Sequence, residues 1–435
     1  MKKSPLIARL ARKFDREVGY ARTLRKEVVR KIFPDHWTFL FGEIALYSFV
    51  ILVMTGIFLS LLFSSGSDTV VYHGSYAPLD GVPMSQAYRS LLHIGFDVRG
   101  GLLLRQIHHW AADVFVAAIV LHIVRLFFTG AYREPRQTNW LIGVTLLILA
   151  VTNGFFGYSI GGDLLSGTGL RIAYAVVLSC PLIGPWLAFL VFGGPPPNPT
   201  LLPRIYSLHI LLVPAVIAFF LTLHLGILWR QKHTNYPGPR RNDSTIVGSR
   251  LWPNYAIKSI AMFLFVSAFL VALGAFAQIN PVWIYGPYFG PAVSAGSQPD
   301  WYLGWAEGAV RLLPRLNIHI FGHQIPQPFY AGFLLGIIVF GWLYFWPTIG
   351  ARLLRDKGIH HVLYLPREHP WLSASGMAVL AFLFVLLLGG GDDVIAVLFN
   401  SRVLNMRYLF RILLVALPVA AVAATYGFLR LRGGK

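Results

Sequence analysis

The chain has very little cysteine: Cys180 is the only one in 435 residues. A single cysteine excludes a disulfide bond within the chain. It also excludes a C-x-x-C-H site for covalent haem and an iron–sulfur cluster held by cysteines of this chain. If such centres take part in the function, other proteins must supply them.

Charged residues are also scarce, at 13%, whereas hydrophobic residues make up 56%. This composition excludes a large water-soluble enzyme and indicates an integral membrane protein. The predicted fold is all-α, a polytopic membrane bundle of eight transmembrane helices. The predicted spans are residues 39–63, 107–128, 140–158, 205–229, 257–277, 330–346, 374–389 and 408–429. A long basic segment precedes the first span, which argues against a cleaved signal peptide.

Acidic residues are few, 18 against 37 lysines and arginines, and the formal net charge is +19. Such an excess can indicate nucleic-acid binding, but the distribution of these residues indicates a membrane topology instead. With eight spans, the segments on one side contain 26 Lys and Arg and those on the other side contain 9. The positive-inside rule therefore predicts that both termini lie in the cytoplasm, with no nucleic-acid partner.

Two of the predicted spans each contain a pair of histidines. His108 and His122 are fourteen residues apart in the second span, and His209 and His224 are fifteen apart in the fourth. At about 100° and 1.5 Å per residue, each pair lies on one broad side of its helix, roughly 21 to 22 Å apart along the axis. Two such helices side by side would bring His108 to His209 and His122 to His224. Each imidazole pair could then bind a flat haem through both axial positions.

His109 is the alternative to His108. It is thirteen residues from His122, which places it about 140° away around the helix, off the shared side. Two other interpretations remain open for the intramembrane histidines: hydrogen-bonded packing residues, and the proton relay of a transporter. The visible spectrum separates haem binding from both, because only haem gives a b-type band.

The first and third spans each contain two glycines fourteen residues apart: Gly42 with Gly56, and Gly143 with Gly157. Small residues at such positions commonly allow helices to pack closely. Beside the histidine pairs, the same spacing favours a second role. A glycine at each haem level leaves room for the edge of the macrocycle against the helix backbone.

The best domain boundary is the polar, proline-containing stretch that follows the fourth span. It divides the chain into a basic N-terminal segment (1–38), a four-helix di-haem domain (39–235) and a C-terminal four-helix domain (236–435). The N-terminal segment is expected to include an amphipathic helix on the anionic membrane surface. Residues 159–204 are expected to form short helices across the outer end of the bundle.

Taken together, these features resemble cytochrome b of the quinol:cytochrome c oxidoreductases (cytochrome bc complexes), over essentially the whole chain. The resemblance lies in the paired His and Gly in order on four spans, MTG at 54–56 and PDWY at 299–302. Arginines also match, three residues before His108, three after His122 and five before His209. The PDWY form resembles the bacterial branch that uses menaquinol.

The resemblance implies two non-covalent haem b groups, each held by two histidines. His108 and His209 would ligate the outer haem, and His122 and His224 the inner one. The further cofactor-binding residues implied are Arg105, Arg125 and Arg204 beside the propionates, with Gly42, Gly56, Gly143 and Gly157. A guanidinium beside a carboxylate offsets its charge in a low-dielectric site. For Arg204, the alternative is an interfacial side chain that reaches to lipid headgroups.

The resemblance also implies a function and its partners. Quinol would be oxidised at an outer site with bifurcated electron transfer, and one electron would pass through both haems to an inner quinone-reducing site. The partners implied are a Rieske iron–sulfur protein and a c-type cytochrome subunit, in a homodimeric complex of the bacterial inner (plasma) membrane that contributes to the proton gradient.

The outer quinol site is expected to contain Asp300 as a proton acceptor and Tyr302 as a hydrogen-bond donor or wall. The alternative for Asp300 is a helix N-cap, because Gln-Pro-Asp before an apolar run also has that signature. The sequence SIGGD at 159–163 departs from the proline-containing turn of relatives. The shape of the outer pocket therefore does not follow from the resemblance.

The inner quinone site is expected to contain Lys258 and His233. Lys258 matches the lysine of the family, but Ser259 stands where an aspartate usually follows. The alternative for both residues is an ordinary basic loop. A second candidate function is the di-haem membrane anchor of a hydrogenase, formate dehydrogenase or nitrate reductase, although these anchors are usually shorter and lack PDWY and the paired glycines.

Overall fold

The computed structural model describes residues 31–291, 298–316, 318–320 and 322–433. Eight helices in this part of the chain are long and apolar enough to cross a membrane, which confirms the predicted eight-span α-helical bundle. They span Trp37–Ser60, Gly101–Phe128, Gln137–Ser159, Leu201–Gln231, Leu251–Phe276, Phe329–Leu354, Pro370–Gly390 and Val403–Leu431. The amphipathic helix expected in the N-terminal segment lies outside the described residues.

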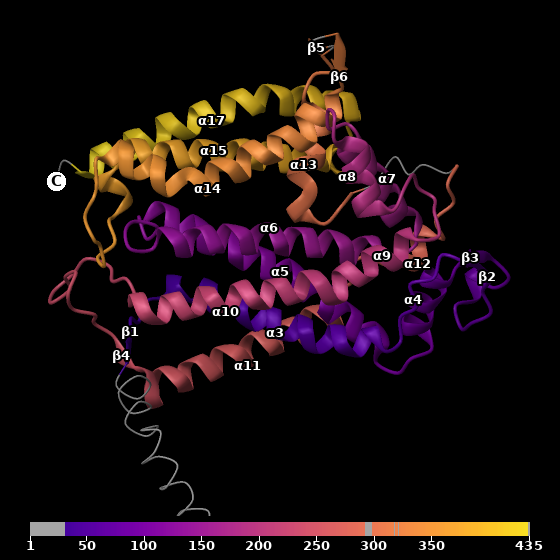
Figure 1. Cartoon of the computed structure of the whole chain (residues 1–435), viewed down its shortest axis with the longest axis horizontal. Helices are drawn as coiled ribbons and strands as arrows, with labels where there is room; N and C mark the ends of the chain where they lie inside the picture. The colour runs from indigo at the N-terminus through magenta and orange to yellow at the C-terminus, as the bar shows by residue number, and fades with distance from the viewer. Residues whose placement is uncertain (1–30, 292–297, 317, 321, 434–435) are drawn as a thin grey trace, which may run out of the picture.

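The elements follow one another along the chain as in Figure 1. The long helices are α3 (Leu40–Ser60), α5 (Gly101–Phe128), α6 (Gln137–Ser159), α10 (Val213–Gln231), α11 (Ala256–Phe276), α14 (Leu335–Leu354), α15 (Pro370–Gly390) and α17 (Val403–Gly433). The short helices are η2 (Trp37–Phe39), η3 (Ala77–Leu79), α4 (Gln86–Phe96), α7 (Leu164–Leu178), α8 (Gly184–Phe192), α9 (Leu201–Ser207), η4 (Leu208–Leu212), η5 (Leu251–Tyr255), α12 (Val282–Tyr285), α13 (Trp301–Leu312), η6 (Phe329–Leu334), η7 (Pro366–Glu368) and α16 (Asp392–Leu398). Three antiparallel two-stranded pairs join β1 (Ile32–Phe33) to β4 (Ser249–Arg250), β2 (Thr69–Val71) to β3 (Pro83–Ser85), and β5 (Ile318–Ile320) to β6 (His323–Ile325).

Four helices form the core of the bundle: α3 packs on α5, α5 on α6, and α6 on α10. Helix α11 packs on α3 and α5, whereas α13, α15 and α17 pack on one another at the opposite side of this core (Figure 1). The predicted domain boundary at 235/236 remains a prediction about the chain. In space, α11 belongs with the helices of the first half.

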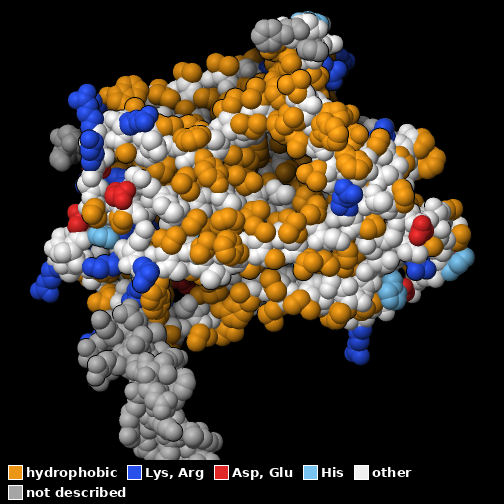
Figure 2. All heavy atoms as spheres, in the orientation of Figure 1, with side chains coloured by type: hydrophobic (Ala, Val, Ile, Leu, Met, Phe, Trp, Pro, Cys, Tyr) orange, Lys and Arg blue, Asp and Glu red, His pale blue; other side chains and the backbone are white. Residues whose placement is uncertain are grey.

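The two ends of the bundle differ. We name the end that bears α4, α7, α8 and α12 the outer end, and the end that bears β1, β4 and the C-terminal part of α17 the inner end (Figure 1). Helices α7 and α8 confirm the short helices expected between residues 159 and 204. Hydrophobic side chains cover the middle of the surface, and most of the Lys and Arg in this view gather at the inner end (Figure 2).

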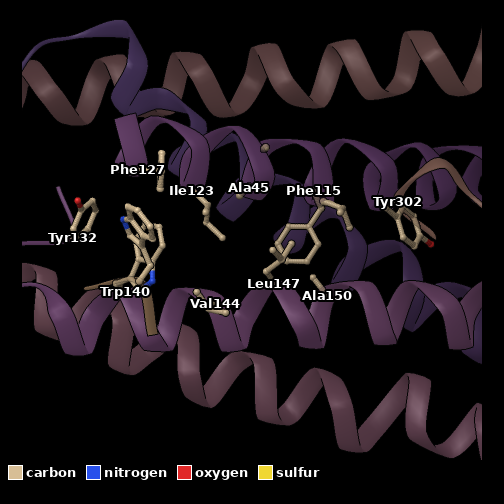
Figure 3. Packing of buried hydrophobic residues seen from close by; sticks show 13 residues of the cluster. Ala45, Phe115, Ile123, Phe127, Tyr132, Trp140, Val144, Leu147, Ala150 and Tyr302 are labelled. Carbon is tan, nitrogen blue, oxygen red and sulfur yellow. The ribbon is translucent and has the colours of Figure 1, made fainter. Parts of the chain in front are cut away.

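An apolar layer fills the middle of the core. Phe115 of α5 lies between the helices, close to Leu147 and Ala150 of α6 (Figure 3). Phe49 of α3 contacts the Phe115 ring, with ring centroids 5.6 Å apart. Since Phe115 is seven residues from both His108 and His122, this layer separates the two histidine levels by about 10 Å of helix on each side.

A buried charge network fastens α13, the PDWY helix, to α16 and α17. Arg311 donates to Asp392 (2.6 Å), Asp393 (3.1 Å) and Glu307, and Arg407 donates to Asp392 (2.9 Å). Asp392 is fully buried. The buried carboxylates of this network are therefore compensated by the two arginines.

Replacing Arg311 by leucine would leave these buried carboxylates without their main counter-charge. We expect a loss of about 3 to 5 kcal/mol in stability, as for other broken buried ion pairs. Thermal or denaturant unfolding of the complex in detergent measures it. Arg402→Leu is the matched control, because Arg402 is exposed and we expect it to change stability little.

Candidate functional site

The two outer histidines face each other across the core. His108 of α5 and His209 of η4 have ring centroids 6.2 Å apart, with ring planes at 83°. A metal ion between two imidazoles, with bonds of about 2 Å to each nitrogen, would place the ring centroids about 6 Å apart. The observed separation therefore suits bis-imidazole coordination.

Both outer imidazoles are held by their Nδ1 atoms. The Thr55 hydroxyl donates to the Ile51 carbonyl (2.7 Å), and its oxygen therefore accepts from Nδ1 of His108 (2.9 Å). Nδ1 of His209 donates to the carbonyl oxygen of Asn153 (3.0 Å). A proton on Nδ1 leaves the Nε2 lone pair free for a metal, which is the usual arrangement of ligating histidines.

A glycine lies against each of the four histidine rings. The pairs are Gly42 with His122, Gly56 with His108, Gly143 with His224 and Gly157 with His209. In the first three pairs, a Cβ added to the glycine would lie 3.2, 3.2 and 3.6 Å from Cε1 of the histidine. In the fourth it would collide with the ring. A side chain is therefore excluded at Gly157 and crowded at Gly42 and Gly56, whereas at Gly143 the added Cβ would make an ordinary contact.

A cavity of about 320 Å³ opens beside the outer pair. Both outer histidines line it, together with Gly56, Gly157 and the guanidinium-bearing Arg105. The remaining wall is mainly apolar, as a flat porphyrin requires. The two imidazoles, the two glycines, the apolar wall and Arg105 together fit a haem held by two histidines.

The inner level has the same residue types, but its histidines are held differently: Nδ1 of His122 and Nδ1 of His224 are buried and have no hydrogen-bond partner in the described part of the chain. His122 and His224 are electrostatic neighbours, each with its glycine. Nε and Nη1 of Arg125 are buried and have no hydrogen-bond partner in the described part of the chain. The guanidinium lies 4.7 Å from the ring centroid of Phe39. Because a buried cation without an acceptor is costly, Arg125 fits a bound anionic group such as a propionate.

The other two predicted propionate arginines differ in position. Arg105 is buried on the wall of the outer cavity and donates to the carbonyl of Asn280 (3.0 Å). Arg204 donates to the carbonyls of Phe189 and Leu190 (2.9 Å each) and is not among the residues that line this cavity. The structure brings Arg105 to the outer site, and the role of Arg204 stays a prediction.

Asp300 and Tyr302 lie together on the wall of the outer cavity. The Tyr302 hydroxyl donates to Asp300 Oδ2 (2.8 Å), and Nε2 of His109 lies 2.8 Å from Asp300 Oδ1. Asp300 occupies the N-cap position of α13, but its side chain caps no backbone amide. The capping alternative for this side chain is therefore wrong, and so is His109 as the partner of His209.

The SIGGD turn forms the rim of the outer cavity. Gly162 has a φ of 70°, which favours glycine, and its carbonyl accepts from the amide of Tyr288 (2.9 Å). Asp163 caps α7 by accepting from the amides of Leu165 and Ser166 (3.0 Å each). This turn is thus held by a backbone hydrogen bond to Tyr288 and by the capped start of α7.

At the inner end, the structure separates the two predicted quinone-site residues. Lys258 lines a second cavity and pairs with Asp35 (2.9 Å). His233 contacts Phe33, with ring centroids 4.3 Å apart and ring planes tilted by 48°, and is not among the residues that line that cavity. Burial, with Lys31 and two arginines nearby, lowers the pKa of His233 to about 4, so its imidazole is neutral.

Comparison with known proteins decides the family. The chain is 46% identical over 422 residues, 97% of its length, to the cytochrome bc1 complex cytochrome b subunit of Mycobacterium leprae, of which it covers 76%. It is 44% identical over 423 residues to the corresponding subunit of Streptomyces coelicolor, covering 97% of this chain and 77% of that one. The chain belongs to the cytochrome b family of bc1 complexes.

Two further comparisons agree with this assignment. The family model described as "Cytochrome b(N-terminal)/b6/petB" matches residues 113–287. A solved chain titled "Hyperthermophilic respiratory Complex III" has a TM-score of 0.70 at 18% identity, covering 95% of this chain and 99% of that chain, which shows the same fold. Membership in the cytochrome b family excludes the transporter and the dehydrogenase membrane anchor.

The sequence does not predict two residues at or beside the outer site, His109 and Asp113. The sequence predicts His109 only as an alternative ligand, whereas in the structure its Nε2 atom is hydrogen-bonded to Asp300. Asp113, one helical turn further on α5, is a buried carboxyl beside Trp301 and Asp300 whose Oδ1 has no hydrogen-bond partner among the described residues. The signal for Asp113 was present, because an acidic residue inside an apolar span is costly and commonly functional.

Proposed function

We propose that this cytochrome b carries two haem b groups, with His108 and His209 as the outer ligands and His122 and His224 as the inner ones. The observation that supports this most is the outer pair: two rings 6.2 Å apart, with both Nδ1 atoms engaged by the protein. When bound, the haems supply one-electron carriers at two depths, so that one electron from quinol can cross to an inner quinone-reducing site.

Quinol oxidation is proposed at the part of the outer cavity wall that bears His109, Asp300 and Tyr302, beside the haem that would lie between His108 and His209. Oxidation of one quinol releases two electrons and two protons. Asp300 lies on the cavity wall and can accept a proton from a quinol hydroxyl, while His109 and Tyr302 hold its two oxygens. One electron would pass to a Rieske iron–sulfur partner and from there to a c-type cytochrome. The other electron would pass to the inner site.

Several finer assignments follow from the family and belong to the proposal. The quinone is menaquinone, as the PDWY sequence favours, and the complex is a homodimer in a bacterial plasma membrane with both termini in the cytoplasm. Proton release at the outer end and uptake at the inner end would contribute to the proton gradient. The excess of Lys and Arg at the inner end supports this orientation.

Purification of the complex in mild detergent tests the proposal. We expect two b haems per chain, a b-type band in the reduced-minus-oxidised spectrum, and co-purification of a Rieske protein and a c-type cytochrome. One haem per chain, or none, would contradict the assignment of four histidine ligands.

Replacing Arg125 by glutamine tests the inner site separately. Removing a buried cation beside the inner haem favours the oxidised state, whose charge is more positive. We expect the midpoint potential of that haem to fall by about 60 mV or more, the value for a tenfold change in a one-electron equilibrium. Redox titration measures it, and Arg367→Gln, at an exposed arginine of the inner end, is the control.

A further inference from the structure

The second cavity, of about 300 Å³, lies at the inner end between α3 and the start of α11. Its polar wall residues are Asp35, His36, Glu43, Tyr255, Lys258 and Ser259, and the rest of the wall is mainly aromatic or apolar. An apolar pocket with a few converging polar groups is the usual form of a small-molecule site.

Glu43 is the acidic side chain at the centre of this cavity's hydrogen bonds. The Tyr255 hydroxyl donates to Glu43 Oε1, and the Tyr47 hydroxyl donates to Oε2 (3.0 Å). Tyr47 is also hydrogen-bonded to Ser259 on the cavity wall. Since hydroxyls can reverse their donor and acceptor roles, this chain can pass a proton between Glu43 and Ser259.

Glu43 also lies beside the inner haem level. The preceding residue, Gly42, lies against the ring of His122, with its added Cβ 3.2 Å from Cε1. A quinone bound in the cavity would therefore lie close to the proposed inner haem, which would supply its electrons. On its other side the cavity reaches water, because the side chains of Lys258 and Asp35 are 58% and 40% exposed.

Two other titratable groups of the wall, Asp35 and His36, are less suited than Glu43 to pass a proton at neutral pH. Burial raises the pKa of Asp35, but hydrogen bonds from Ser249 and Lys258 outweigh this and lower it below its ordinary value. Burial and the nearby Arg125 and Arg241 lower the pKa of His36, so it is neutral. Lys258 pairs with Asp35 at the exposed mouth of the cavity.

We propose that Glu43 is a catalytic residue of the inner site, and that it gives a proton to the quinone reduced there. This inference rests on the proposed function. Quinone takes up two electrons, one at a time from the haem at His122 and His224, and two protons to become quinol. One proton is passed to one quinone oxygen by Glu43, which takes it up from water through Ser259 and Tyr47, and the other leaves the Lys258 ammonium for the second oxygen. Water at the exposed mouth then returns a proton to Lys258.

Glu43→Gln and Glu43→Asp in the intact complex test the inference. With the outer site blocked by an inhibitor, a short-chain naphthoquinol reduces the inner haem by the reverse reaction, which stopped-flow spectroscopy records. We expect about a 100-fold slower rate in Glu43→Gln, the typical contribution of a general acid or base, and recovery of most of it in Glu43→Asp. Glu368→Gln, at an exposed inner acid, should leave the rate unchanged.

Two further measurements separate the possible failures. The infrared difference spectrum on adding naphthoquinone should contain a carboxyl band that Glu43→Gln removes. If Glu43→Gln does not assemble, Tyr47→Phe, which interrupts the path to Ser259, should slow the rate several-fold. An unchanged rate in a Glu43→Gln complex with both haems would overturn the role of Glu43. A wild-type complex without the haems would instead overturn the proposed function.

Discussion

Replacing His209 by asparagine leaves a complex with one b haem per chain instead of two, and quinol oxidation falls at least about 100-fold, or about 2.7 kcal/mol in activation free energy. The expectation follows from the geometry of the outer pair. Asparagine would be too short to reach an iron held between these two rings, and His108 alone would supply one ligand instead of two. Haem analysis and the reduced-minus-oxidised spectrum measure the loss independently of activity.

The control for His209→Asn is His93→Asn, which removes an imidazole at the outer end that pairs with Asp97 and is half exposed. It should keep both haems. His224→Asn should remove the other haem, so that the two variants have complementary spectra. A His209→Asn complex that retains two haems with unchanged spectra would exclude the proposed ligand pairs.

Replacing Asp300 by asparagine lowers the rate of quinol oxidation by about 10²- to 10⁴-fold while both haems remain, because a positioned acid–base group contributes about that much. The amide keeps the size of the side chain and can still contact Tyr302, but it cannot take up a proton. Steady-state reduction of cytochrome c by a quinol analogue measures the rate, and the spectrum verifies the haems.

Asp300→Glu is the matched variant, because it keeps the carboxyl group on a side chain that is one methylene longer. We expect it to recover a large part of the rate. Tyr302→Phe removes one of the two hydrogen bonds to the carboxylate and should have a smaller effect than Asp300→Asn. If Asp300→Asn oxidises quinol at the wild-type rate, another group accepts the proton, and Asp113 is the next one to test.

Hydropathy predicted the eight spans because membrane helices need about 20 apolar residues, a strong one-dimensional signal. Their ends were less predictable. The sixth span was expected to end at residue 346, but α14 continues through Pro347 to Leu354. A proline removes only one backbone hydrogen bond, and neighbouring helices allow such a helix to continue.

The fifteen-residue spacing of His209 and His224 has a structural explanation that the sequence did not give. Residues Leu208–Leu212 form a π turn, in which the amide of Val213 donates to the carbonyl of Leu208. Pro214 follows and cannot donate to the fourth residue before it. A π turn accommodates one extra residue, so the fifteen-residue pair has nearly the orientation of the fourteen-residue pair on α5.

The partner of Asp300 could not be predicted, because His109 is 191 residues away in the chain. The same holds for the inner cavity, where Glu43 of α3 meets Tyr255 of η5 across 212 residues. Periodicity places residues on a helix face but does not say which helices are neighbours. Such contacts depend on tertiary packing.

The apolar layer of Phe49, Phe115, Leu147 and Ala150 has an electrical consequence. These four side chains are apolar and give an ion or a proton no polar group to bind. Under the proposed function, an electron that passes from the outer level to the inner one would cross this layer without an accompanying charge. Each such transfer would add to the voltage across the bilayer, and an opposing voltage would slow the next one.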